Sequence, residues 1–215
     1  MSAWLFDLDG TLVDTAPDLA AAANHLRRLD GLSPLPIAHY RPAASGGARG
    51  LIQAGLGLAD DHPRFPALRE QFLAHYRAHL ADQSRLFEGL DPVLRTMEQR
   101  GIRWGVVTNK PAWLTAPLMA ALDLADRAAV CVSADEAPAP KPAPDALLLA
   151  CTRAGLLPEA CHYVGDDRRD IEAGRAAGMR TVAVNWGYTG NNGAPASWGA
   201  DHLVDHPADL LTLIR

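Results

Sequence analysis

Trp4-Leu-Phe-Asp7-Leu-Asp9-Gly-Thr-Leu-Val-Asp-Thr15 is a short apolar run that ends in two carboxylates one residue apart. In a strand, side chains at positions i and i+2 point to the same side, so Asp7 and Asp9 can reach one small volume where the strand ends. Two anions that close repel each other unless a cation or a shared proton lies between them. The stretch therefore predicts a buried strand that opens onto a site, with a metal ion as the commoner way to hold both carboxylates.

Beyond this strand the apolar pattern becomes helical. Apolar residues recur at helical spacing over residues 19–29, 51–58 and 66–80, with no β-branched run between them. Thr15 and Asp18 have the spacing of a capping box at the start of the first of these helices. We therefore expect residues 15–84 to form an all-helical domain, inserted into a core made of residues 1–14 and 85–215.

From residue 86 onward, apolar strands alternate with helices. We expect strands over residues 102–108, 129–133, 162–165, 181–184 and 202–204, with residues 186–199 as a surface loop. Continuous apolar strands that alternate with helices are typical of a parallel sheet covered on both faces. The predicted fold class is thus α/β, with a Rossmann-like parallel sheet and a helical insertion after the first strand. In such a sheet, ligands bind at the carboxyl ends of the strands.

Composition narrows the possible partners and location. The chain has 215 residues, of which 48% are hydrophobic and 21% charged, as in ordinary globular proteins. Its net charge of −5 gives no electrostatic reason to expect nucleic acid or an anionic membrane as a partner. No basic leader and no membrane-length apolar run are evident, so we expect a cytoplasmic protein. The sequence carries no signal for an oligomeric state.

Polar residues gather at the carboxyl ends of the predicted strands. The set comprises Asp7, Asp9, Thr108, Asn109, Lys141, Asp166, Asp167 and Asp170. Carboxylate and carbonyl oxygens from Asp7, Asp9 and Asp166 suit Mg²⁺, which prefers few protein ligands together with water and phosphate. A hydroxyl, an amide and an ammonium from Thr108, Asn109 and Lys141 can hold the oxygens of a transferring phosphoryl group. These residue types predict a phosphoryl-transfer site for a small phosphorylated metabolite.

Four segments of this set resemble the motifs of the haloacid dehalogenase superfamily, in the same order. They are Asp7-Leu-Asp-Gly-Thr11, Thr108-Asn109, Lys141-Pro142 and Gly165-Asp-Asp-Arg-Arg-Asp170. The resemblance implies a Mg²⁺-dependent enzyme with a helical cap, here residues 15–84.

The resemblance also implies a role for each residue. Asp7 would be the nucleophile that becomes phosphorylated. Asp9 would be the general acid and then the base, and its carbonyl would bind the metal together with Asp7 and Asp166. Thr108 and Lys141 would bind the phosphoryl group. Either Asp167 or Asp170 could support the metal from the outer shell, and spacing alone does not choose between them.

Asp9 favours a phosphatase or phosphomutase, because the dehalogenase branch of the superfamily lacks an acid at this position. Among phosphatases, the chain resembles the phosphoglycolate phosphatases, and we expect an activity of that kind. The first alternative is a related bacterial group that acts on N-acetylmuramic acid 6-phosphate in cell-wall recycling. A β-phosphoglucomutase-like phosphomutase and a phosphate-binding pseudoenzyme are the further alternatives. A signalling receiver domain uses a similar acidic cluster with Thr and Lys, but it lacks a helical insert of this size.

Three further residues are less clear from the sequence. Arg49, within Ser45-Gly-Gly-Ala-Arg-Gly50, is either a solvated turn residue or a ligand for a substrate carboxylate or phosphate. We expect the second, and thus an effect of Arg49 on substrate selectivity. Lys110 is expected to neutralise the site or to face solvent. Asp14 is expected to act at the entry to the first helix of the insert rather than as a ligand.

Overall fold

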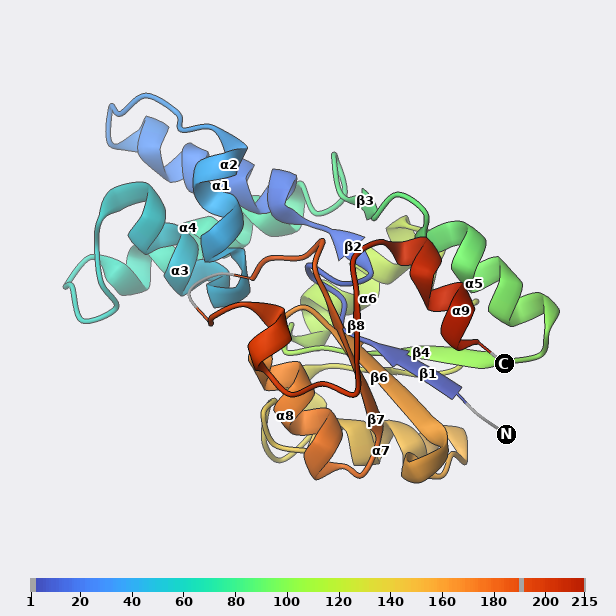
Figure 1. Cartoon of the computed structure of the whole chain (residues 1–215). Helices are drawn as coiled ribbons and strands as arrows, with labels where there is room; N and C mark the ends of the chain where they lie inside the picture. The colour runs from blue at the N-terminus through green and yellow to red at the C-terminus, as the bar shows by residue number, and fades with distance from the viewer. Residues whose placement is uncertain (1–2, 190–191, 215) are drawn as a thin grey trace.

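A six-stranded, all-parallel sheet forms the centre of the computed structural model, which describes residues 3–189 and 192–214. The strand order is β5-β4-β1-β6-β7-β8 (Figure 1). The strands are β1 (Ala3–Phe6), β4 (Arg103–Val107), β5 (Cys131–Val132), β6 (Cys161–Gly165), β7 (Arg180–Val184) and β8 (His202–Val204). The predicted fold class is confirmed.

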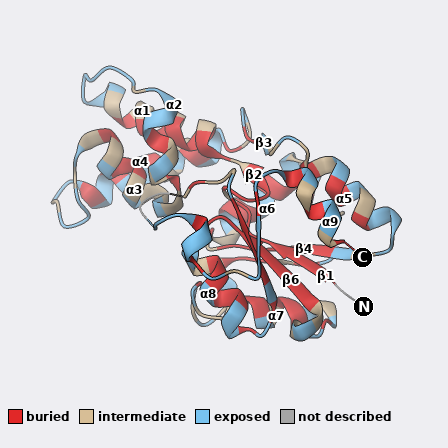
Figure 2. Cartoon of the chain, in the orientation of Figure 1, coloured by how far each residue is buried: buried red, intermediate tan, exposed pale blue. Residues whose placement is uncertain are grey.

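Helices cover both faces of this sheet, as the apolar strands require. They are α5 (Leu90–Gln99), α6 (Ala112–Ala121), α7 (Asp145–Ala154), α8 (Arg168–Ala176) and α9 (Leu210–Leu213). Trp4 and Phe6 of β1 belong to the hydrophobic cluster that includes α5, α6 and α9, whereas Ala3 and Leu5 belong to the one that includes α7 and α8. Successive strand residues point to opposite faces of the sheet, and both faces are covered by helices. β1 is therefore buried along its whole length (Figure 2).

Four helices between residues 15 and 84 lie beyond the carboxyl ends of the strands (Figure 1). They are α1 (Ala16–Leu29), α2 (Ile37–Tyr40), α3 (Gly47–Leu56) and α4 (Phe65–Ala78). Short 3₁₀ segments also occur: η1 (Arg41–Gly46), η2 (Ala134–Glu136), η3 (Pro158–Ala160), η4 (Pro195–Ser197) and η5 (Pro207–Asp209). None of the helices in the described residues is long and apolar enough to cross a membrane.

The chain enters and leaves the helical insert through two adjacent strands. β2 (Val13–Asp14) pairs antiparallel with β3 (Arg85–Leu86). The expected domain boundaries at residues 14/15 and 84/85 fall within or directly beside this pair. They stay a prediction, which the pairing supports.

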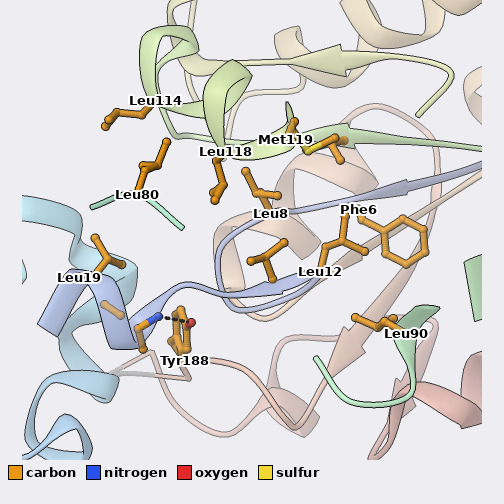
Figure 3. Packing of buried hydrophobic residues seen from close by; sticks show 14 of the residues in the cluster. Phe6, Leu8, Leu12, Leu19, Leu80, Leu90, Leu114, Leu118, Met119 and Tyr188 are labelled. Carbon is orange, nitrogen blue, oxygen red and sulfur yellow. Dashed lines mark hydrogen bonds between the residues drawn. The ribbon is translucent and has the colours of Figure 1, made fainter. Parts of the chain in front are cut away.

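Apolar packing joins the insert to the core without a break. Leu19 of α1 and Leu80 after α4 lie near Leu114 of α6 in Figure 3, and all three belong to the cluster that contains Phe6. Tyr188 lies at the same junction, where its hydroxyl accepts a hydrogen bond from the backbone N–H of Ala16 at 2.8 Å. The insert is therefore packed directly against the end of the sheet where the candidate site lies.

The expected capping box at the start of α1 is wrong, although the helix does begin at Ala16. The Thr15 hydroxyl donates instead to the Asp9 carboxylate at 2.6 Å. Asp18 is buried and accepts hydrogen bonds from the backbone N–H groups of Gln83 and Ser84 and from the Ser84 hydroxyl. A buried carboxylate needs several donors, and the returning end of the insert supplies them. The two ends of the insert are thereby tied together.

Candidate active site

All nine residues proposed from the sequence line one cavity of about 420 Å³. They are Asp7, Asp9, Arg49, Thr108, Asn109, Lys141, Asp166, Asp167 and Asp170. The cavity lies between the carboxyl ends of the strands and the helical insert. Asp7 follows β1, Thr108 follows β4 and Asp166 follows β6, so the parallel sheet brings together residues that are far apart in the sequence.

Three buried carboxylates form the centre of this site. Asp7, Asp166 and Asp170 each offer an oxygen atom, and these atoms all lie within 4.8 Å of one another. Burial raises the pKa of Asp7 to about 7, against the lowering effect of Lys141 and with a further increase from Asp170. Burial, followed by the charges of Asp7 and Asp170, also raises the pKa of Asp166.

Lys141 is the ammonium that faces these carboxylates. Its Nζ donates to Asp7 and to Asp170, each at 2.7 Å. The pKa of Lys141 is raised, because the two carboxylates outweigh the lowering effect of burial. One ammonium does not balance three carboxylates, and a divalent cation among hard oxygen ligands would. The acidic cluster thus fits a metal site.

Neighbouring groups fix the direction of Asp166 and Lys141. The Thr11 hydroxyl and the backbone N–H of Tyr188 donate to the two oxygens of Asp166, at 2.7 and 2.6 Å. The Asn109 side chain forms two hydrogen bonds with the backbone of Lys141, at 2.9 and 3.0 Å. Asn109 was expected to hold the phosphoryl group, but its amide is engaged in holding the lysine loop.

The geometry separates the two acids that spacing did not distinguish. Asp167 caps α8 and accepts from the backbone and the guanidinium of Arg169, both at 2.9 Å. Burial would raise the pKa of Asp167, but Arg169 brings it below its ordinary value. Asp170 instead faces Asp7 and Asp166 across Lys141. Asp170 is therefore the better candidate to support a metal from outside.

The side chain of Asp9 is not part of the cluster formed by the carboxylates of Asp7, Asp166 and Asp170. Its carboxylate accepts from Thr15 at 2.6 Å and from Lys110 at 3.0 Å. The alternative in which Lys110 faces solvent is wrong, because its side chain is 6% exposed and lines the cavity. Asp14 behaves as expected, since its carboxylate accepts from the backbone N–H of Ala16 at the start of α1.

Several contributors were not found from the sequence. Tyr76, Tyr163 and Tyr188 contact Lys110, Lys141 and Asp166 respectively, and they come from α4, β6 and the loop predicted after β7. An isolated tyrosine in a helical or apolar pattern is indistinguishable from an ordinary core residue. For Tyr188, the sequence offered one signal, the preceding Gly187. A glycine near a predicted site often marks a place where the backbone closely approaches another group, here the side chain of Asp166.

Gly187 leaves no room for a side chain beside Asp166. A Cβ atom there would lie 2.1 Å from the Cβ of Asp166. We expect Gly187→Ala to displace Asp166 and to lower the affinity of the acidic cluster for a divalent cation by about 10- to 100-fold, as when the support of a metal ligand is lost. Calorimetric titration of the protein with Mg²⁺ measures this effect.

The matched control for Gly187→Ala is Gly178→Ala. Gly178 has a φ of 76° and no neighbour that a Cβ would meet within 4 Å, so the substitution strains the backbone away from the site. It should lower the melting temperature and leave the Mg²⁺ titration unchanged. An unchanged titration in Gly187→Ala would show that Asp166 is not a ligand.

Side chains of the insert and of α6 line the same cavity. Phe72 and Tyr76 from α4 and Trp113 from α6 are among them. Arg49 and Arg69 line it as well, and both are exposed. Arg49 forms only a long ion pair with Asp60, at 3.5 Å, and Arg69 forms none with any residue that the structure describes. Two available guanidinium groups and an aromatic surface suit an anionic, ring-containing ligand.

Comparison with known proteins agrees with this geometry. The model of the family "haloacid dehalogenase-like hydrolase" matches residues 4–184, and the chain belongs to this family. Together with the curated relatives, this match identifies the chain as a phosphatase of the haloacid dehalogenase superfamily.

Two curated relatives carry different substrate names. The chain is 44% identical over 214 residues to the N-acetylmuramic acid 6-phosphate phosphatase of Pseudomonas aeruginosa, covering 100% of this chain and 95% of the relative. It is 43% identical over 206 residues to the phosphoglycolate phosphatase of Xanthomonas campestris pv. campestris, covering 96% and 93%. Among solved structures, a predicted phosphoglycolate phosphatase from Haemophilus somnus superimposes with a TM-score of 0.87 at 28% identity, covering 100% of this chain and 98% of that one.

Proposed function

We propose that this chain hydrolyses N-acetylmuramic acid 6-phosphate, with Mg²⁺ as cofactor and a phosphorylated Asp7 as intermediate. The observation that carries the choice of substrate is the size and lining of the cavity. Its volume of about 420 Å³, which includes the space around the acidic cluster, exceeds what a phosphorylated two-carbon acid needs and lies in the usual range for pockets that enclose whole organic ligands. An amino sugar with a lactyl carboxylate offers a ring for Trp113 and an anion for the arginines.

The reaction begins with attack of an Asp7 carboxylate oxygen on phosphorus, while the bond from phosphorus to the sugar oxygen breaks. Asp9 gives its proton to the departing oxygen, and Lys141 and Thr108 hold the phosphoryl oxygens. Asp9 then accepts a proton from water, whose oxygen attacks phosphorus and releases phosphate and the free Asp7 carboxylate.

Residues at the carboxyl ends of β1 and β6 would hold the cofactor. We assign the side chains of Asp7 and Asp166 and the backbone carbonyl of Asp9 to Mg²⁺, with Asp170 as outer support. The raised pKa of Asp7 and of Asp166 supports this assignment. When bound, the cation would offset the repulsion between the Asp7 carboxylate and the phosphate dianion.

Phosphoglycolate is the second candidate substrate, because the relative from Xanthomonas campestris is named for it and its carboxylate would also suit Arg49 or Arg69. A phosphomutase would return the phosphate to the sugar, and a pseudoenzyme would release none. Cytoplasmic location stays a prediction from the sequence.

A substrate panel distinguishes these functions. We expect phosphate release from N-acetylmuramic acid 6-phosphate to have a higher kcat/KM than release from 2-phosphoglycolate or N-acetylglucosamine 6-phosphate, and a chelator to abolish all three. Arg49→Ala and Arg69→Ala should each lower kcat/KM for the carboxylated sugar by about tenfold, the usual loss for one hydrogen bond to a charged group. They should leave N-acetylglucosamine 6-phosphate unaffected, since it lacks the carboxylate.

The control variant is Arg95→Ala, which removes an exposed arginine of α5 whose partner is Asp91. Arg95→Ala should leave the kcat/KM of every substrate in the panel unchanged. A higher kcat/KM for 2-phosphoglycolate would assign the second candidate substrate. Equal losses on the sugar phosphates with and without the carboxylate would remove both arginines from carboxylate binding.

A further inference from the structure

Lys110 connects the candidate acid Asp9 to the helical insert. Its Nζ donates to the two oxygens of Asp9, at 3.0 and 3.3 Å, and to the hydroxyl of Tyr76, at 2.8 Å. Lys110 belongs to the core, directly after β4, whereas Tyr76 lies in the last turn of α4. This hydrogen-bonded path runs from the insert to a residue at the carboxyl end of β1.

The charges in this path are fixed. Burial alone would lower the pKa of Lys110, but Asp9 and Tyr76 raise it above its ordinary value. Burial raises the pKa of Tyr76 to about 12, against the lowering effect of Lys110. Lys110 is thus an ammonium that donates to both partners, and Tyr76 is a neutral phenol that accepts.

The two ends of Lys110 are held by different parts of the molecule. Its backbone N–H donates to the Thr108 hydroxyl at 3.1 Å, and its carbonyl accepts from Ala134 and Thr115. These bonds belong to the core and fix the backbone of Lys110. The ammonium depends on Asp9 and Tyr76, and it also lies 4.6 Å from the centroid of the Tyr76 ring.

We propose that Tyr76 is a positioning residue which, through Lys110, holds the Asp9 carboxylate in the orientation needed for proton transfer. Asp9 is then correctly oriented only while α4 is packed against the core in the observed position. The placement of the insert thereby controls the chemistry of the core. This inference rests on the proposed role of Asp9 as general acid and base.

The consequence differs for the two halves of the reaction. A p-nitrophenolate leaving group departs without a proton, so phosphorylation of Asp7 by p-nitrophenyl phosphate does not need Asp9 as an acid. Hydrolysis of phosphorylated Asp7 still needs Asp9 as a base toward water. Loss of the Tyr76 hydroxyl should therefore slow the second half-reaction and leave the first unchanged with this substrate.

The test is Tyr76→Phe, which removes one oxygen atom and keeps the ring, mixed rapidly with p-nitrophenyl phosphate and Mg²⁺. We expect a first turnover at the rate of the parent, released as a burst of nearly one p-nitrophenolate per active site. The steady rate should then fall about tenfold, a part of the roughly 10²- to 10⁴-fold contribution of general acid–base catalysis. Lys110→Met should give the same burst and an equal or larger fall in the steady rate.

The matched control is Tyr40→Phe. Tyr40 is also a buried tyrosine of the insert, and its hydroxyl donates to Asn24 at 2.9 Å, away from Lys110. Tyr40→Phe should show the burst and the steady rate of the parent. This result would separate the effect of losing the Tyr76 hydroxyl from the effect of losing any buried hydroxyl. The melting temperature of each variant establishes that it is folded.

Two results would overturn the inference. One is an unchanged steady rate in Tyr76→Phe. The other is a raised KM with unchanged kcat, which would make Tyr76 a lining residue of the substrate pocket only. Failure of the proposed function is a separate result, because a burst that survives Asp7→Asn would rule out phosphorylation of Asp7 whatever Tyr76 does.

Discussion

Asp7→Asn should abolish turnover, with a fall in kcat of about 10⁴-fold or more, as expected when a nucleophile is removed. Asparagine has nearly the shape of aspartate, so the packing at the end of β1 is kept. Its amide is a poor nucleophile toward phosphorus and a poor ligand for Mg²⁺. Phosphate release from the best substrate of the panel, followed at saturating Mg²⁺, measures the loss.

The same variant should be more stable than the parent when a chelator is present. The pKa of Asp7 is about 7 in the folded chain and has an ordinary value of 3.8. The unfolded chain therefore loses this proton more readily, and Asp7 destabilises the fold increasingly as the pH rises from about 4 to about 7. Asp7→Asn removes this part of the pH dependence, which melting temperatures measured across that range would show.

The control for the loss of turnover is Asp9→Asn. It keeps the nucleophile, so it should still become phosphorylated on Asp7 by an aryl phosphate, while its turnover fails at the hydrolysis step. Mass spectrometry of the trapped protein detects the added phosphoryl group. Turnover by Asp7→Asn at the rate of the parent would contradict the mechanism.

Lys141→Met should produce the largest loss of stability. Methionine fills the space of the lysine stem but leaves the carboxylates of Asp7 and Asp170 buried without their ammonium, since both bond it at 2.7 Å. Removing one partner of such a buried ion pair typically costs about 3–5 kcal/mol of folding free energy. We expect this loss in urea denaturation at neutral pH with a chelator, and a smaller loss with Mg²⁺, which would bind among the same carboxylates.

Lys110→Met is the matched comparison, because Lys110 is the second buried lysine of the site. It pairs with one carboxylate, that of Asp9, whose side chain is 22% exposed. The loss of stability should therefore be smaller than for Lys141→Met and should depend little on Mg²⁺. Equal losses in the two variants, with and without Mg²⁺, would argue against a metal between Asp7 and Asp166.

The sheet and most of the site could be predicted because both follow from local patterns. Most residues of each core strand are apolar, and the site residues of the core lie in the few residues that follow a strand or in the loop of Lys141. The carboxyl ends of parallel strands meet at one edge, so position in the sequence was enough to bring these residues together. Arg49 was harder, because nothing local ties a loop of the insert to that edge.

Residues that act through tertiary contacts could not be predicted. Lys110 follows Asn109 in a turn, and only the position of Tyr76 on α4 shows that its side chain is buried. Thr15 and Asp18 have the pattern of a capping box, yet each has a stronger partner elsewhere in the fold. The local preference for a capping box is overridden here, because the carboxylates of Asp9 and Asp18 need hydrogen-bond donors.

The choice between Asp167 and Asp170 could not be made from the sequence. The two acids form a reciprocal cap at the start of α8, in which each accepts a hydrogen bond from a backbone N–H. This local pattern does not distinguish them. They differ in their second contacts, because Asp170 accepts from Lys141 at 2.7 Å whereas Asp167 accepts from the guanidinium of Arg169.

The β2–β3 pair has a consequence for how enzymes of this kind can diversify. The two connections to the insert run side by side, so the chain leaves the core and returns to it at neighbouring points. The distance between these points is the same whatever the length of the insert. An insert can therefore lengthen or shorten without moving Asp7 or Lys141. A different insert would also have to supply the partner that Tyr76 provides for Lys110, so the paired strands leave the length of the insert free while the contact with Asp9 constrains the end of α4.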